Sequence, residues 1–168
     1  MKKLLVALGV IVVLVAGYTV YTIVRPFVVH TEIEVDATPE QVWKVLADRQ
    51  AYAEWNPFII SSTGELTAGG TITNVLRDTE GKETTFTPEL LVVEPNKELR
   101  WVGKIAFGGI FDGEHAFRLE ELPNGRTRLI HEETFRGVAV PFTKSLLTKT
   151  IQPQFVAMNH ALAARAAV

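Results

Sequence analysis

The chain has 168 residues, of which 47% are hydrophobic and 21% are charged, so it can bury the core of one ordinary domain with a short appendage. Its formal net charge is -2 and it carries no long basic run, which argues against a nucleic-acid partner. It contains no cysteine, so disulfides and thiolate metal sites are excluded.

The N-terminal segment is uncharged from residue 4 to residue 24 and is flanked by basic residues. About 20 consecutive apolar residues are enough to span a bilayer, and Tyr18 and Tyr21 suit its interfacial belt. Residues 1–26 are therefore predicted to be a transmembrane anchor, with the N-terminus in the cytoplasm and the domain on the outer side of the membrane. A signal peptide that is cleaved within this segment, leaving a secreted domain, is the alternative.

The next residues predict one strand and two short helices. Apolar and polar residues alternate over residues 28–36, as in a half-buried strand. Thr38, Pro39 and Gln41 have the spacing of a helix N-cap, a first-turn proline and a capping box. A second short helix is expected to end at Asn56, because asparagine before proline favours a turn.

From Phe58 onward, short apolar runs alternate with turn signals. The turns are expected at residues 67–70, 78–81, 94–97, 108–109 and 123–125, and their close spacing favours an antiparallel meander. Residues 142–168 return to helical spacing, and Pro153 is expected to kink this segment or to begin its main helix. This C-terminal helix is the element long enough to cover the concave apolar face of a curved sheet.

The segment FDGEHAF (residues 111–117) places one histidine in an apolar strand. Its aromatic residues are expected to face the C-terminal helix, so the alternation points His115 inward. Residues 122–126 fit a three-residue turn with glycine in the left-handed position. That turn places His115 opposite Glu133 and puts His131 on the same inner face of the sheet.

His115, His131 and Glu133 are therefore predicted to form one inward polar cluster. A carboxylate opposite a histidine can orient its ring and raise its pKa, so these three are the candidate catalytic residues if the chain is an enzyme. Two histidines and a carboxylate could also bind a metal in principle. The expected role is hydrogen bonding that satisfies buried groups or orients a ligand, with no metal and no cofactor.

Four segments, taken in order, resemble a known superfamily: DATPEQVWKVLAD, YAEWNPFI, PELLVVEPNKELRWVG and FDGEHAFRLEELPNGRTRLIHEETFRG. Residues 27–168 resemble the SRPBCC superfamily, also called START-like or helix-grip, which includes polyketide cyclase/dehydrase-like proteins. The resemblance implies an α+β domain in which a curved seven-stranded antiparallel sheet wraps around a long C-terminal helix and a hydrophobic cavity. Members of the superfamily bind lipids, sterols, polyketides and other bulky apolar molecules, and a minority are enzymes.

The predicted function is binding of a hydrophobic small molecule or lipid between the sheet and the C-terminal helix, by a domain tethered to the bilayer. The side chains expected to contact the ligand are Trp55, Phe86, Trp101, Phe111, His115, Phe117, His131, Glu133, Phe135, Phe155, Met158 and Asn159. An enzyme of cyclase, dehydratase or hydrolase type is one alternative. A protein-interaction module with a filled core is another.

Overall fold

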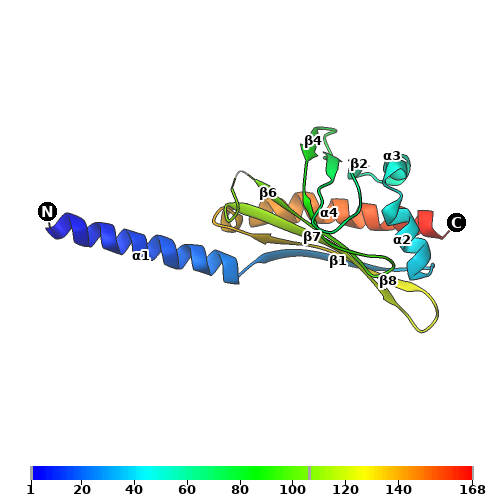
Figure 1. Cartoon of the computed structure of the whole chain (residues 1–168), viewed down its shortest axis with the longest axis horizontal. Coiled ribbons are helices and arrows are strands. Elements are labelled where there is room, and N and C mark those ends of the chain that lie inside the picture. Colours follow the sequence, from blue (N-terminus) through cyan, green and yellow to red (C-terminus); the bar gives the residue numbers. More distant parts are fainter. Residues whose placement is uncertain (1, 106, 168) are drawn as a thin grey trace.

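The computed structural model describes residues 2–105 and 107–167. Figure 1 shows a long N-terminal helix that projects from an α+β domain, and a C-terminus at the opposite end of that domain. The elements are α1 (Lys2–Val24), β1 (Phe27–Val35), α2 (Pro39–Ala47), the 3-10 helix η1 (Arg49–Ala51), α3 (Tyr52–Trp55), β2 (Ile59–Thr63), β3 (Thr73–Arg77), β4 (Glu83–Phe86), β5 (Glu89–Glu94), β6 (Glu98–Ile105), β7 (Phe111–Glu121), β8 (Thr127–Arg136) and α4 (Val140–Ala166). This order confirms the predicted α+β class.

The strands form two antiparallel sheets, with the orders β1-β8-β7-β6-β5 and β2-β3-β4. The expected count of seven strands is wrong, because the described residues form eight. Pro88 interrupts the chain between β4 and β5, where a proline offers no N–H to a strand ladder. The two strands that flank it therefore pair with different neighbours. Backbone hydrogen bonds, such as that from the N–H of Leu90 to the carbonyl of Gly70 (2.8 Å), still join β5 to the connection between β2 and β3.

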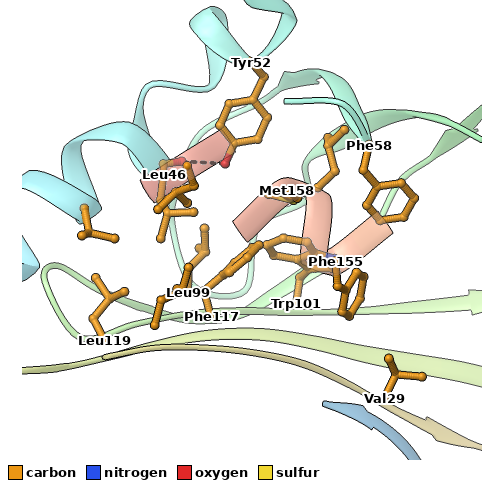
Figure 2. Close-up of a cluster of buried hydrophobic side chains, with 14 of the residues drawn as sticks. Val29, Leu46, Tyr52, Phe58, Leu99, Trp101, Phe117, Leu119, Phe155 and Met158 are labelled. Atoms are coloured by element: carbon orange, nitrogen blue, oxygen red, sulfur yellow. Dashed lines mark hydrogen bonds between the residues drawn. The ribbon is translucent and has the colours of Figure 1, made fainter. Parts of the chain in front are cut away.

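The C-terminal helix α4 packs on the inner face of the larger sheet. Its residues Phe155, Met158 and Leu162 are fully buried and recur at helical spacing, so they form one apolar stripe. Figure 2 shows this cluster between the helix and the strands. Burial of each such side chain contributes about 1.5–3 kcal/mol relative to its exposure.

Pro153 lies inside α4 and does not begin it, so that part of the expectation is wrong. The helix starts at Val140, and buried side chains on both sides of the proline, Leu147 and Phe155, hold the flanking turns against the domain. This packing outweighs the loss of one backbone hydrogen bond at the proline.

The turn between β7 and β8 has the predicted geometry. The N–H of Leu122 donates to the carbonyl of Arg126 at 2.8 Å, and Gly125 has a φ of 76°. His115 consequently lies opposite Glu133 in the ladder, as expected. A shift of one residue would have turned every inner side chain outward, so this short turn sets the orientation of the whole inner face.

Side-chain caps fix the short helices and the bend that follows them. Thr38 forms the predicted capping box with Gln41 at the start of α2. Asn56 is buried, and its Oδ1 accepts hydrogen bonds from the backbone N–H groups of Phe58 (3.0 Å) and Ile59 (2.9 Å). The predicted turn at Asn56 is therefore confirmed, and the amide directs the chain into β2.

Replacing Asn56 by alanine is expected to lower the free energy of unfolding by about 1–3 kcal/mol, because two backbone N–H groups lose their acceptor inside the protein. Urea unfolding of the full chain in mild detergent, followed by tryptophan fluorescence, measures the change. The matched control is Asn124→Ala, because Asn124 is exposed and caps one exposed N–H of a surface turn. Equal losses in the two variants would contradict this role of Asn56.

Candidate functional site

The inner face of the larger sheet holds two histidines beneath α4. His115 of β7 and His131 of β8 are 4% and 0% exposed. The ring of Phe155 stacks on His131 with centroids 3.8 Å apart, and the ring of Trp101 stacks on His115 at 4.3 Å. Both imidazoles are thus enclosed by aromatic rings and lie out of contact with bulk water.

A continuous chain of hydrogen bonds links these histidines to β1 and α4. Nε2 of His131 lies 2.9 Å from Nε2 of His115, and its Nδ1 lies 2.7 Å from Oδ1 of Asn159. Asn159 donates to Oγ1 of Thr31 at 2.9 Å, and Thr31 donates to the backbone carbonyl of His131 at 3.1 Å. Asn159 is buried on α4, so the chain ties the helix to the sheet.

The direction of this chain follows from its donors and acceptors. Thr31 has one hydroxyl proton, which it gives to a carbonyl, so Asn159 must present its NH₂ group to Thr31. The oxygen of Asn159 then accepts a proton from Nδ1 of His131. A neutral His131 therefore has a bare Nε2, which accepts from the Nε2–H of His115. Nδ1 of His115 is left as an acceptor at the end of this hydrogen-bond chain.

Glu133 faces that end of the chain. Its Oε2 lies 3.7 Å from Nδ1 of His115, which is longer than a hydrogen bond, and its side chain is 17% exposed. Gly113 makes room for the carboxyl group, because a Cβ at this glycine would lie 2.5 Å from Oε1 of Glu133. The carboxyl group of Glu133 therefore occupies space that a side chain on β7 would otherwise take.

Burial keeps this cluster uncharged near neutral pH. Loss of hydration lowers the pKa of His115 to about 3 and raises the pKa of Glu133 to about 8. The pKa of His131 lies well below its ordinary value, mainly through burial and also through the neighbouring His115. The expectation that Glu133 raises the pKa of a histidine is wrong, because burial also removes the charge of the carboxylate that would have done so.

These contacts decide which chemistry the cluster can perform. Both ring nitrogens of His131 are engaged, so this histidine has no lone pair left for a metal. Among residues 2–105 and 107–167, no group of three or more histidine, cysteine, aspartate or glutamate side chains could hold a metal ion. A protonated Glu133 can donate a hydrogen bond, and Nδ1 of His115 can accept one. The site therefore offers a neutral donor and a neutral acceptor to a polar group placed between them.

Most of the predicted ligand-contacting residues lie together around the histidine pair or next to it on the inner face. Phe111 and Phe135 pack ring to ring at 5.5 Å near Glu133, and Phe117 lies 4.3 Å from His131 between ring centroids. The others in this group are Trp101, Phe155, Met158 and Asn159.

Of the two remaining predicted residues, Trp55 lies apart from this group and Phe86 reaches it from the smaller sheet. Trp55 packs edge-on against Tyr52 at 5.2 Å, among the short helices. Phe86 belongs to β4 of the smaller sheet, but its ring lies over Gly103 of β6, where a Cβ would lie 1.9 Å from the ring. Gly103 pairs with Gly113, so this ring lies on the inner face next to the carboxyl group of Glu133. Among the residues of the hydrogen-bond chain, Thr31 is the one that the sequence analysis did not identify. Its one signal was a polar residue on the buried side of an alternating strand.

The aromatic rings around the histidines pack against one another in this structure. A surface hollow of about 240 Å³ lies beside α4 and is lined in part by Phe58 and Gln154. The ring of Phe58 lies 5.9 Å from that of Phe155, which in turn stacks on His131. Two aromatic rings therefore separate this hollow from the polar chain.

Comparison with known proteins supports the fold and gives the family. Residues 26–167 match the family described as polyketide cyclase / dehydrase and lipid transport. The chain belongs to this family. No curated protein matches the sequence significantly.

Solved structures with the same fold include several aromatase/cyclases. The Zhui aromatase/cyclase from Streptomyces sp. R1128 is 20% identical with a TM-score of 0.67, covering 84% of this chain and 94% of its own. The di-domain aromatase/cyclase BexL from the BE-7585A biosynthetic pathway is 15% identical with a TM-score of 0.69, covering 85% of this chain. This chain spans 50% of the length of BexL. A protein of Thermus thermophilus is 17% identical with a TM-score of 0.65, covering 83% of this chain and 97% of its own.

The stability of the domain is expected to fall as the pH rises from about 6.5 to about 8. In this range the folded state keeps a proton on Glu133 that the unfolded chain has released, and the loss is at most about 1.4 kcal/mol per pH unit. Below pH 6.5 the two buried histidines reverse the trend. They take up protons only in the unfolded state, so stability falls again as the pH decreases.

Urea unfolding at a series of pH values tests this with Glu133→Gln, which keeps the shape of the acid and cannot ionise. The variant is expected to lose the decline between pH 6.5 and 8. The exposed Glu65→Gln is the control and is expected to keep it. An unchanged decline in Glu133→Gln would show that Glu133 is not the group responsible.

Proposed function

We propose that this chain is a membrane-anchored domain that binds an apolar small molecule or lipid bearing a polar group, between the larger sheet and α4. The observation that carries the proposal is the end of the buried polar chain. Nδ1 of His115 and the carboxyl group of Glu133 face one another at 3.7 Å without forming a hydrogen bond. A hydroxyl group that enters there would satisfy both, because it can accept from the acid and donate to the ring nitrogen, whereas a carbonyl group would accept from the acid alone.

The surroundings of this site suit the remainder of such a ligand. Aromatic side chains from two strands, Phe111 and Phe135, lie next to Glu133 on the inner face and can contact an apolar body. Because these rings are packed in the present structure, ligand entry requires them to turn aside. The family description, which names both cyclases and lipid transport, supports a ligand of this class.

The proposed anchor is α1. Its 23 residues reach about 35 Å at 1.5 Å per residue, which is enough to cross the hydrocarbon core of a bilayer. The helix is apolar on all faces, and its most apolar stretch is not buried against the domain. The two N-terminal lysines favour a cytoplasmic N-terminus with the domain on the outer side. Intact mass of the mature protein distinguishes this anchor from a cleaved signal sequence.

Native mass spectrometry of the full chain, extracted gently from its host membrane, is expected to detect a co-purified apolar molecule. The His115→Phe variant keeps a ring in the core and removes the acceptor nitrogen, so it is expected to retain about tenfold less of that molecule, equivalent to the loss of one hydrogen bond. The control is His160→Phe, at an exposed position on α4. A protein that is empty after extraction and takes up no lipid from added vesicles would contradict the proposal.

An acid–base enzyme of cyclase or dehydratase type is the second candidate. The observation that favours it is the pairing of a protonated carboxyl group with an unprotonated histidine nitrogen, which can deliver one proton and accept another. With the molecule identified by mass spectrometry as substrate, Glu133→Gln is expected to lower kcat by about 10²–10⁴-fold while binding persists. Unchanged turnover in this variant would eliminate the enzymatic role and leave the binding role standing.

A further inference from the structure

The end of the domain nearest α1 is joined to that helix directly. The hydroxyl of Tyr18 donates to the backbone carbonyl of Val138 at 2.9 Å, and Thr22 is 3% exposed. Tyr18 precedes the last residue of α1, Val24, by about 9 Å along the helix axis. This end of the domain therefore lies beside Tyr18 and Thr22 of α1, and not beyond the last residue of that helix.

Two segments build this end of the domain. The β6–β7 connection and the start of α4 are tied together by hydrogen bonds from the N–H of Val138 to the carbonyl of Gly109 and from the N–H of Ala139 to the carbonyl of Ile110, both 3.0 Å. Figure 1 shows the start of α4 at the end of the domain that faces α1. The exposed side chains of these two segments consequently lie beside the proposed anchor.

What they expose is strongly apolar. Phe107 is 78% exposed and Phe142 is 83% exposed, and Ile110 and Leu146 are exposed beside them in the same two segments. These four residues are called the apolar tip below. Phe142 and Leu146 lie one turn apart on α4, so they extend from the same face of the helix. Large apolar side chains grouped on a surface in this way mark a contact with a partner or a membrane.

We infer that the apolar tip inserts into the interfacial layer of the bilayer and presents the inner face of the sheet to the membrane. The inference rests on the proposed anchor, because it is α1 that brings the tip to the bilayer. Tyrosines of transmembrane helices favour the level of the lipid headgroups, and Tyr18 is bonded to the tip segment at this level. Aromatic side chains such as Phe107 and Phe142 are suited to the same layer.

Basic side chains around the tip match the phosphate groups of that layer. Arg25 follows α1 directly, Lys104 lies near the end of β6, and Lys144 lies on the first turns of α4. The ammonium group of Lys144 lies 5.8 Å from the centroid of the Phe27 ring, so an apolar and a cationic side chain already meet there. Long cationic side chains can reach headgroup phosphates while their methylene groups stay in apolar surroundings.

The position of the apolar tip also indicates the direction from which a ligand would reach Glu133 and His115. From the tip inward, the inner face of β7 and β8 presents first Phe111 and Phe135 and then the facing pair His115 and Glu133. The carboxyl group of Glu133 leans over Gly113, toward the tip, so it is met before the ring of His115. Phe111 and His115 are separated by four residues, or about 13 Å along the strand. A bilayer amphiphile that entered at the tip would pass two aromatic rings and then meet the carboxyl group of Glu133. The predicted ligand class is therefore a membrane-resident amphiphile with a hydroxyl head.

Depth-dependent fluorescence quenching tests the inference on the full chain. Because the chain contains no cysteine, a single cysteine can be placed at Phe107 or Phe142 and labelled with an environment-sensitive dye. The protein is reconstituted in phosphatidylcholine vesicles with and without lipids that carry a nitroxide near the headgroup. Labels at both positions are expected to lose at least half of their emission with the nitroxide lipids. A label at Asn124, in the β7–β8 turn at the far end of the domain, is expected to lose almost none.

A label at Leu8, within α1, separates the possible failures. Quenching at Leu8 without quenching at Phe107 and Phe142 would keep the anchor and overturn the inference. Absence of quenching at Leu8 would overturn the proposed anchor as well. Blue-shifted emission at the tip that responds to protein dilution and not to nitroxide lipids would identify a second copy of the chain as the occupant, which also overturns the inference. Ligand retention in native mass spectrometry tests the proposed binding function separately, and its result does not depend on these three quenching outcomes.

Discussion

A ring nitrogen enclosed by aromatic side chains must find a hydrogen-bond partner or lower the stability of the fold, and this constraint organises the interior of the domain. Each missing partner would cost about 1–3 kcal/mol. The hydrogen bonds from Thr31 through Asn159 and His131 to His115 meet the requirement for three of the four ring nitrogens, with four side chains from three strands and one helix, and leave Nδ1 of His115 facing Glu133. Because Asn159 sits on α4, the same bonds fix how far that helix is shifted along the sheet.

The neutrality of the cluster follows from its enclosure and bears directly on function. A charged histidine or carboxylate would bind an ionic ligand, whereas a neutral acceptor beside a neutral acid suits a hydroxyl group on an apolar molecule. The position of the neutral acid depends on Gly113, since a side chain there would displace the carboxyl group of Glu133. The proposed route from the membrane reaches this carboxyl group before it reaches His115.

Local rules were sufficient to predict much of the fold and half of the site. The turn at residues 122–126 has only one length that agrees with both alternations, so the facing of His115 and Glu133 followed from the sequence. The capping box at Thr38 and the turn at Asn56 were likewise local. Exposure of α1 followed from its uniform apolarity.

Properties that depend on how α4 packs could not be predicted in this way. Which ring nitrogens meet, and the part played by Thr31, depend on where a helix distant in sequence crosses the sheet. The sign of the histidine pKa shifts depends on the same burial. Phe86 reaches the inner face of the larger sheet from the smaller sheet, and this route could not be predicted because no periodicity in a single strand reports which sheet the strand joins.

The proposed binding site depends most directly on the protonation state of the two buried imidazoles. Long-range ¹H–¹⁵N correlation spectra of the full chain in micelles, with histidine nitrogens labelled, report the tautomer and charge of each ring directly. At pH 7 and at pH 5.5 both rings are expected to carry a single proton, on Nδ1 in His131 and on Nε2 in His115. A doubly protonated ring at either position at pH 7, or the opposite tautomer in His131, would contradict this assignment.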